Sequence, residues 1–133
     1  MEVVIIHWLI KKGKEDDFEN RWKSMVVGEK EGLFREILTK VDHSSDDPKF
    51  HTFHLEDPNY TTYLNIGIWD SLESFDKAIG KYIPKQEEAT EGDKTVFKIV
   101  LEEFEFKMRE RICLKKVLDR GSKLNWPSPD LSN

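Results

Sequence analysis

The segment YLNIGIWDSLESFDKAIG, residues 63–80, contains a strand that passes directly into a helix. Side chains of the strand alternate between two faces, one with Leu64, Ile66 and Ile68 and the other with Tyr63, Asn65, Gly67 and Trp69. One face can therefore pack while the other lines a site. Asp70 and Glu73 have the spacing of a helix capping box, and an apolar stripe follows on Leu72, Phe75 and Ile79. This pair of elements predicts the fold more clearly than it predicts the function.

The composition is that of a folded protein with one domain. The chain has 133 residues, of which 35% are charged, 38% hydrophobic and 11% aromatic. Such a chain is too hydrophobic for a disordered protein and has the size of a single domain. Its net charge of -5 comes from intermixed signs. We therefore expect neither a nucleic-acid partner nor an acidic membrane partner.

The single cysteine and the amino-terminal stretch indicate in which compartment the protein is expected. Cys113 has no second cysteine with which to form an internal disulfide, and its apolar neighbours favour a small core residue over a nucleophile. The stretch MEVVIIHWLIKKG is apolar but short, and no basic leader precedes its hydrophobic run. We expect it to form a first strand rather than a signal peptide, which favours a cytoplasmic location.

Hydrophobic periodicity predicts the order of elements along the chain. We expect strands at 3–10, 33–41, 63–69 and 108–118, and helices at 14–27, 71–83 and 95–106. Gly28 and Gly32 break the first helix, and Pro84 ends or kinks the second. Residues 1–121 are expected to form one domain, and residues 122–133 an extended tail.

The connection from His43 to Thr62 is longer than a hairpin needs and carries several turn signals. This excursion is a candidate for the specificity of the protein. Its possible metal ligands are His43, His51, His54, Glu56 and Asp57. In an extended strand, residues 51 and 54 would point to opposite faces, so we expect a solvated loop and no metal site.

The predicted order is strand, helix, strand, strand, helix, strand, with an extra helix before the last strand, and it is typical of the α+β class. We expect a ferredoxin-like sandwich in which both helices cover one face of a four-stranded antiparallel sheet. The other face would be a bare apolar surface. A second copy of the chain would cover it, so we expect a homodimer.

Three stretches resemble a known family. VVIIHWLIKKGKEDDFENRW, YLNIGIWDSLESFDKAIG and FEFKMRERICLKKVLDRG are similar to parts of the antibiotic biosynthesis monooxygenase-like domains of the dimeric α/β-barrel superfamily. The resemblance spans residues 3–121 and rests on fold signatures. It implies a homodimeric barrel, with a ligand pocket in each subunit between the sheet and the helices. Some members oxidise polycyclic phenols or quinol-like substrates with dioxygen alone, some cleave haem, and many have no demonstrated reaction.

The haem-cleaving members of this family imply three residues in the pocket. Trp69 matches the tryptophan that ends their third strand. Their first-strand asparagine falls at Ile6 in this chain, and residues 71–83 contain no histidine to act as their iron ligand. The resemblance therefore argues against haem degradation, and no cofactor is expected.

The cofactor-free members suggest a different chemistry. It requires a base that takes a proton from the substrate, and donors that stabilise the developing anion in a dry pocket. His7 is the candidate base, with Asn65 or Tyr63 as donors and Trp8, Trp22 and Trp69 as the apolar wall. The expected catalytic set is His7, Asn65 and Trp69, and the ligand-binding set is Trp8, Trp22 and Tyr63. The expected substrate is an aromatic, quinol-like molecule.

Several alternatives stay open. A lone strand histidine is more often hydrogen-bonded structure than catalyst, and His7 points away from the site if Trp8 points inward. Trp69 can equally be a core or pocket-wall aromatic. The protein can be a non-catalytic ligand-binding or regulatory dimer. It can also be a module that binds a partner through the His43 to Thr62 excursion.

Overall fold

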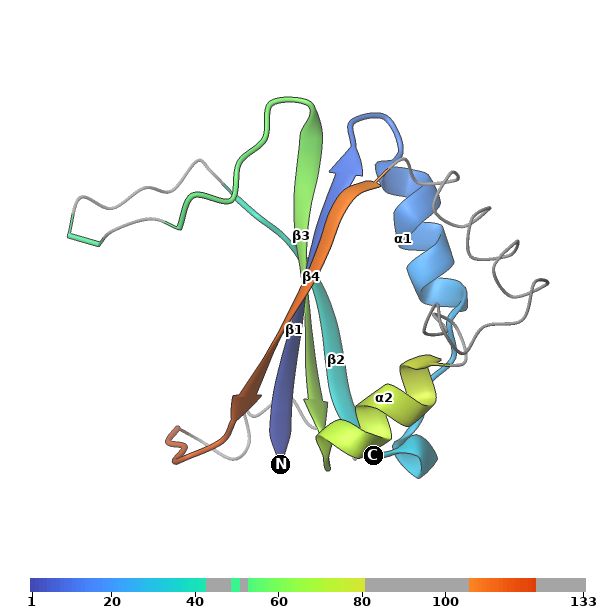
Figure 1. The fold of residues 1–133 in the computed structure, drawn as a ribbon, viewed down its shortest axis with the longest axis vertical. Coiled ribbons are helices and arrows are strands. Elements are labelled where there is room, and N and C mark those ends of the chain that lie inside the picture. The colour runs from blue at the N-terminus through green and yellow to red at the C-terminus, as the bar shows by residue number, and fades with distance from the viewer. Residues whose placement is uncertain (43–48, 51–52, 81–105, 122–133) are drawn as a thin grey trace.

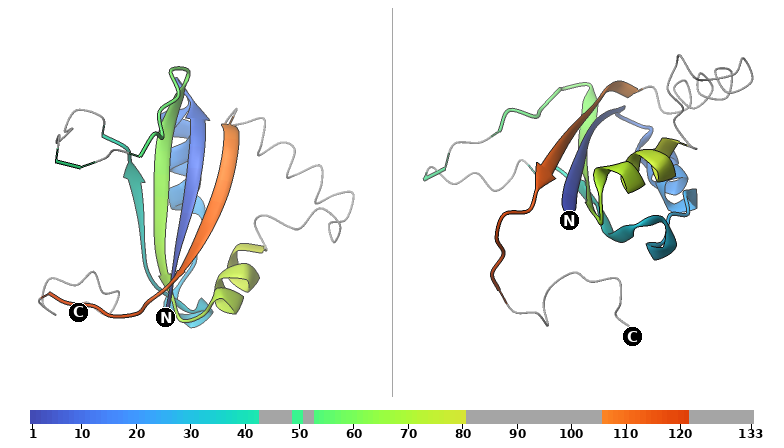
Figure 2. Two further views of the ribbon diagram at one scale, coloured as in Figure 1. Left: turned by 60° about the vertical axis from the view of Figure 1, so that its left-hand side comes forward. Right: turned by 60° about the horizontal axis from the view of Figure 1, so that its bottom comes forward.

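The computed structural model describes residues 1–42, 49–50, 53–80 and 106–121. Its elements are β1 (Glu2–Lys11), α1 (Glu15–Ser24), the 3-10 helix η1 (Glu29–Glu31), β2 (Leu33–Lys40), β3 (Tyr60–Trp69), α2 (Leu72–Gly80) and β4 (Phe106–Lys115). The strands form one antiparallel sheet in the order β2-β3-β1-β4. Both helices lie on the same side of the sheet (Figures 1 and 2). The predicted α+β ferredoxin-like fold is confirmed.

Strand register divides the side chains of the sheet between two faces. Ile5 of β1 lies opposite Ile66 of β3 and Ile112 of β4, whereas Ile6 lies opposite Asn65 and Arg111. Residues that lie opposite each other share a face. We call the side toward α1 and α2 the helix face, and the side that carries Ile5, Ile66 and Ile112 the open face.

The helix face carries two hydrophobic clusters. The larger contains Val4, Ile6, Leu33, Trp69, Phe75 and Ala78. Within it, Phe75 of α2 meets the Trp69 ring edge-on, with 5.3 Å between the ring centroids. The smaller cluster contains Ile10, Phe18 and Tyr63, and Phe18 anchors α1 because its ring lies 5.2 Å from Trp8 and 4.9 Å from Tyr63. Cys113 packs partly buried against the larger cluster, as its apolar neighbours predict.

Several predicted boundaries differ from the structure. Helix α1 ends at Ser24, not near Val27, because Met25 is extended (ψ 109). Strand β3 begins at Tyr60, since residues 60–62 already pair with β1. Strand β4 begins at Phe106 and ends at Lys115, so Phe106 belongs to a strand rather than to the predicted helix at 95–106.

The cap of α2 also differs from the predicted capping box of Asp70 with Glu73. The Ser71 hydroxyl accepts the Ser74 backbone N–H at 3.1 Å, which is the contact that a helix N-cap makes. Asp70 lies one residue earlier, and a hydrogen bond from the Ser74 side chain is the main cause that lowers its pKa. The predicted apolar stripe of α2 is confirmed, because Leu72, Phe75 and Ile79 all belong to the larger cluster or pack against it.

Parts of the prediction fall outside the described residues. These are the end of the second helix at Pro84, most of the helix at 95–106, and the tail at 122–133. None of the helices in the described part of the chain combines the length and the apolar composition that a membrane crossing requires.

The turn before β2 requires a glycine at residue 32. Gly32 has φ 93, and a Cβ atom there would lie 2.6 Å from Asp70 Oδ1 and 2.7 Å from the Ser74 side chain. Its carbonyl also accepts the Asp70 backbone N–H at 2.9 Å. The close approach of η1 to the start of α2 therefore depends on the missing side chain.

Gly32→Ala should lower the free energy of unfolding by about 2 kcal/mol, because alanine would be strained at positive φ and would push Asp70 and Ser74 away. Urea denaturation monitored by circular dichroism measures the difference. Gly28→Ala is the matched control, since Gly28 has φ -123 and open space around it. Equal stabilities of the two variants would contradict the strained turn.

Candidate functional site

A chain of polar side chains crosses the helix face from α1 to β2. Trp22 Nε1 of α1 donates a hydrogen bond to Asn65 Oδ1 of β3 at 3.0 Å. Asn65 Nδ2 donates in turn to Glu36 Oε2 of β2 at 3.3 Å. Asn65 is 4% exposed, so its amide is held at both ends in a largely dry environment. Two predicted site residues, Trp22 and Asn65, thus meet directly.

Glu36 is a carboxyl group that the sequence analysis did not single out. It is partly buried, and burial raises its pKa above the ordinary value, although the Asn65 hydrogen bond opposes this shift. Among the described residues no lysine or arginine forms an ion pair with it. A partly desolvated carboxyl with a raised pKa is suited to accept a proton from a bound molecule.

Glu36 could have been found from the alternation of β2. In the strand predicted at 33–41, side chains at residues 34, 36 and 38 alternate onto one face, and Phe34 and Leu38 are apolar. A glutamate in an otherwise apolar row is the signal. Glu36 lies opposite Gly67 in the sheet register, which places it next to the residue over which Trp69 folds.

Trp69 is fully buried, and its indole folds back over Gly67. A Cβ atom on Gly67 would lie 2.6 Å from Trp69 Nε1 and 3.6 Å from Glu36 Oε2. The glycine therefore makes room for the indole, and the space above its Cα lies close to both the indole nitrogen and the carboxyl group. This buried N–H has no hydrogen-bond partner within the described part of the chain. Since an unsatisfied buried donor costs free energy, it is a potential partner for a ligand oxygen.

The hydroxyl of Tyr63 is already engaged. It donates to Glu19 Oε2 of α1 at 2.7 Å, and Lys40 Nζ lies 3.5 Å from the same oxygen. The Tyr63 bond is the largest cause that lowers the pKa of Glu19, and burial is the largest that raises the pKa of Tyr63. Tyr63 thus ties α1 to the sheet, whereas Trp8 provides partly buried aromatic surface against both clusters.

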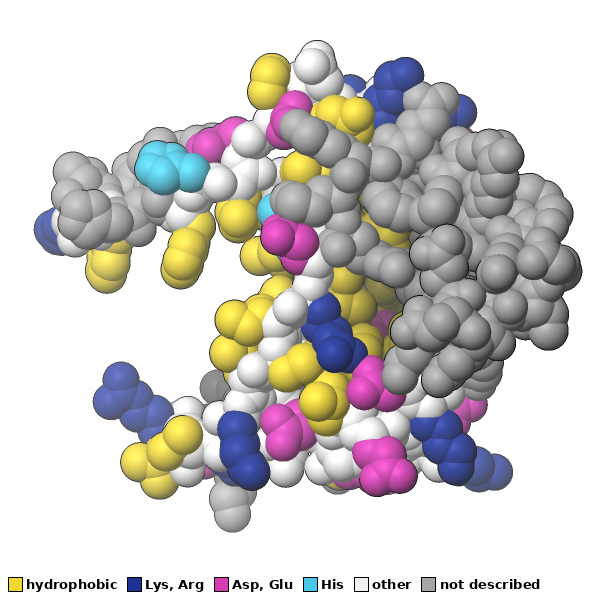
Figure 3. Space-filling model, in the orientation of Figure 1, with side chains coloured by type: hydrophobic (Ala, Val, Ile, Leu, Met, Phe, Trp, Pro, Cys, Tyr) yellow, Lys and Arg dark blue, Asp and Glu magenta, His cyan; other side chains and the backbone are white. Residues whose placement is uncertain are grey.

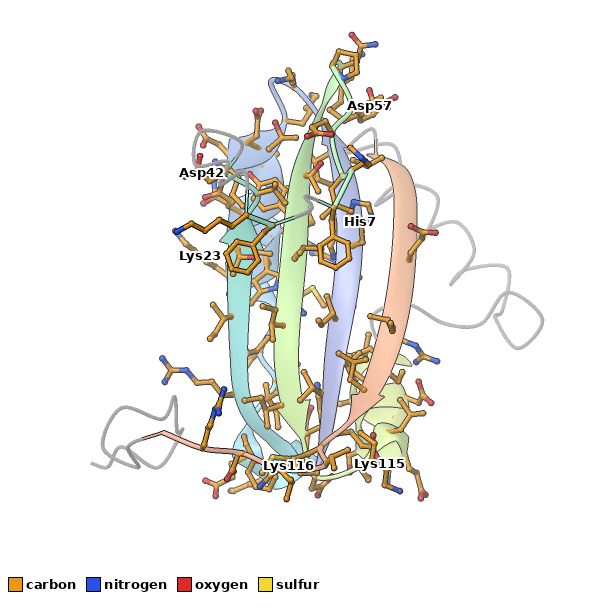
Figure 4. The ribbon with its side chains drawn as sticks, turned by 90° about the vertical axis from the view of Figure 1, so that its left-hand side faces the viewer. His7, Lys23, Asp42, Asp57, Lys115 and Lys116 are labelled. Carbon is orange, nitrogen blue, oxygen red and sulfur yellow. The ribbon has the colours of Figure 1, made fainter. Side chains whose placement is uncertain are left out.

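The structure separates His7 from the other predicted catalytic residues. His7 lies on the open face opposite Leu64, whereas Trp8 points to the helix face. Its Nδ1 atom is 3.3 Å from Glu110 Oε1 of β4, and Figure 4 labels it in a view onto that side of the sheet. The prediction that His7 acts in one pocket with Asn65 and Trp69 is therefore wrong. Consecutive strand residues point to opposite faces, and Trp8 occupies the inward position.

The possible metal ligands of the excursion are only partly described. His54, Glu56 and Asp57 lie within the described residues, whereas His43 and His51 lie outside them. Within the described ranges no group of three potential ligands is close enough to hold a metal ion.

The free energy of unfolding of Glu36→Gln should increase relative to that of wild type as the pH rises. Because the folded-state pKa is raised, wild type keeps its full stability below the ordinary glutamate pKa of 4.5 and loses part of it as the pH rises through the folded-state value. Glutamine cannot ionise and still offers an oxygen to Asn65. Unfolding free energies from about pH 4 to about pH 8 measure the difference.

The matched control is Glu73→Gln, which removes an exposed carboxyl group from α2. Burial without a nearby cation in the described part of the chain should give Glu36→Gln the larger pH-dependent change. Equal changes for Glu36→Gln and Glu73→Gln would contradict the desolvation of Glu36.

Comparison with solved structures finds proteins of similar fold, whereas comparison with curated sequences finds none. No protein-family model matches the chain, and no curated protein sequence does. Among solved structures, the chain is similar to a point mutant of MhuD with two manganese protoporphyrin IX bound per active site. The TM-score is 0.52 at 15% identity, over 90% of this chain and 99% of that chain.

A second similar structure is a dimeric ferredoxin-like protein from an uncultured marine organism. The TM-score is 0.54 at 14% identity, over 92% of this chain and all (100%) of the other. At such identities the likeness concerns the fold. The chain therefore has a ferredoxin-like fold, in agreement with the resemblance of its sequence to antibiotic biosynthesis monooxygenase-like domains.

Proposed function

We propose that this chain is a homodimeric small-molecule-binding protein whose site lies on the helix face beside Glu36, Asn65 and Trp69. The observation that carries the proposal is the pairing of a partly buried carboxyl of raised pKa with a nearby buried indole N–H. The first can accept a proton and the second can donate to an oxygen. Two aromatic side chains on this face, Trp8 packed against the cluster that contains Trp69 and Trp22 hydrogen-bonded to Asn65, favour a flat apolar ligand.

The reaction that these groups suit best is oxygenation by dioxygen without a cofactor. The ionised Glu36 carboxylate would take a proton from the activated CH2 group of an anthrone-like substrate. The resulting anion would pass one electron to dioxygen, and recombination of the two radicals would form a peroxide anion at that carbon, which would take the proton back from Glu36 to give the hydroperoxide. Loss of water would leave a carbonyl group, so that CH2 and O2 become C=O and H2O. Glu36 thereby takes the role that the sequence analysis gave to His7.

The other residues would support this step. Asn65 holds the Glu36 carboxyl through its amide and is itself held by Trp22, so it is a positioning residue. The Trp69 N–H would donate to the substrate oxygen on which negative charge develops. Low exposure of Asn65 and Trp69, at 4% and 0%, limits the access of water to the anion.

The residues do not fit haem cleavage. A similar structure binds a manganese porphyrin, but residues 72–80 of α2 contain no histidine, and Ile6 stands on the helix face of β1. His7, which could bind a metal, lies on the open face. We therefore derive no step through a porphyrin.

Oxygen consumption with anthrone, which has the required CH2 group, tests the reaction. Glu36→Gln should lower the rate at least about 100-fold, as expected for the loss of a general base, while tryptophan fluorescence should report binding within about threefold of wild type. Glu73→Gln is the control and should match wild type in both measurements.

Different outcomes separate the alternatives. Binding by wild type without oxygen consumption would leave the non-catalytic ligand-binding or regulatory protein. Equal rates for wild type and Glu36→Gln would contradict the role of Glu36 as the base. If anthrone did not bind, the proposed ligand class would be wrong.

Two observations support the homodimer. The open face presents apolar side chains to solvent, among them Ile37, Ile112 and Leu114 with 37%, 54% and 40% exposure. Contiguous apolar surface of this kind marks an interaction site. One of the proteins with a similar fold is described as dimeric. A second copy docked through the same face would satisfy both observations, because a two-fold interface uses one patch twice.

Ile112→Glu should turn the dimer into a monomer. Ile112 is exposed in the single chain, so glutamate there leaves the fold intact, but the dimer interface would bury an unpaired charge from each subunit. Sedimentation velocity should show a dissociation constant raised at least about 100-fold. Val26→Glu, at an exposed site between α1 and η1, is the control. A wild type that stays monomeric at micromolar concentrations would contradict the homodimer.

A further inference from the structure

The connection between β2 and β3 carries two exposed phenylalanines. Phe50 is 74% exposed and Phe53 is 85% exposed. They lie on the segment that we call the arm, which comprises the described residues 49–50 and 53–55. The arm is attached to the sheet, because Thr62 Oγ1 of β3 donates to the Leu55 carbonyl oxygen at 2.5 Å. Two large apolar side chains in water are unfavourable unless something covers them.

The arm projects from the open-face side of the sheet, away from α1 and α2 (Figure 1). The space-filling view shows the molecule hollowed between the arm and the segment after β4, with hydrophobic side chains along the rim of the hollow (Figure 3). On the far side of the hollow, Val117 and Leu118 are 84% and 88% exposed. The arm, the open face and this segment therefore bound one apolar concavity.

The distribution of charge across the open face resembles a protein interface. The two central strands contribute Val3, Ile5, His7, Leu9, Thr62, Leu64, Ile66 and Ile68 to it, of which only His7 can titrate. Glu110 stands on the edge strand β4, and Arg35 on the edge strand β2, opposite Ile68. A central region without charges and a charged rim are characteristic of surfaces that bind another protein.

The area of the sheet is too small for a stable interface by itself. Four strands, three of ten residues and one of eight, cover at most about 33 Å by about 19 Å, or roughly 600 Å². A typical stable interface buries about 800 Å² on each partner. Each phenylalanine can add about 150 Å² or more. The sheet and the arm together reach the size that the sheet alone does not.

We propose that the arm is a clasp, and that Phe50 and Phe53 close over a second copy of this chain docked on the open face. This inference rests on the proposed homodimer and adds the segment that stabilises it. Because the arm and the open face project to the same side, a two-fold related copy brings its own face against the first and its own arm around the first subunit. The phenylalanines of both chains are then covered.

The experiment is a monomer–dimer titration of the full chain by sedimentation velocity. The double variant Phe50→Ser, Phe53→Ser should raise the dissociation constant at least about 30-fold, since it removes large apolar contacts twice in the dimer. Val26→Ser is the matched control, because Val26 is also an exposed apolar residue, at 75%, but lies between α1 and η1. It should leave the dissociation constant unchanged.

The outcomes distinguish the clasp from the dimer itself. A dimer that Ile112→Glu dissociates but the arm variant does not would overturn the clasp and leave the homodimer standing. A monomeric wild type would overturn both. Thermal unfolding of the arm variant, measured below the dissociation constant, should match wild type. A clear loss of monomer stability would mean that the phenylalanines serve their own subunit, and it too would overturn the clasp.

Discussion

The antiparallel pairing of β1 with β3 is the constraint on which the rest of the molecule depends. It runs without a shift from Glu2 opposite Trp69 to Lys11 opposite Tyr60. Because strand side chains alternate, this one register decides which residues meet the helices and which form the open face. A slip by one residue in β3 would move Asn65 and Trp69 out of the helix face and dissolve both hydrophobic clusters.

The sequence predicts the sheet well because alternation is a local property. The strands, the two faces of β3 and the apolar stripe of α2 all follow from spacing alone. Alternation also states that His7 and Trp8 point to opposite sides, but it cannot state which side holds the helices. That choice depends on distant partners, since Phe18 of α1 packs against Trp8. The wrong placement of His7 has this origin, whereas Glu36 was detectable from alternation as a glutamate between Phe34 and Leu38.

Glu36 places a carboxyl group on a strand face whose neighbouring side chains are mainly apolar. A core position on β2 would be better filled by an apolar side chain, and burial without a cation raises the free energy of the ionised carboxyl. Gly67 in the adjacent strand weakens the sheet locally and allows the Trp69 indole to fold over it with an N–H that has no partner in the described part of the chain. Two unfavourable local choices at adjoining positions, opposite each other in the register, are more typical of a site than of a core.

The proposed ligand site lies on the helix face and the proposed dimer interface on the open face, but the two are linked through β2. Glu36 belongs to β2, which is an edge strand in the single chain, and edge strands lack a hydrogen-bonded neighbour on one side. Ile37, the next residue, belongs to the open face and is 37% exposed. In the proposed dimer a second copy would cover Ile37 and so restrain the backbone that carries Glu36. The position of the carboxyl group relative to Asn65 and Trp69 would then depend on assembly, although the partner contributes no residue to the helix face.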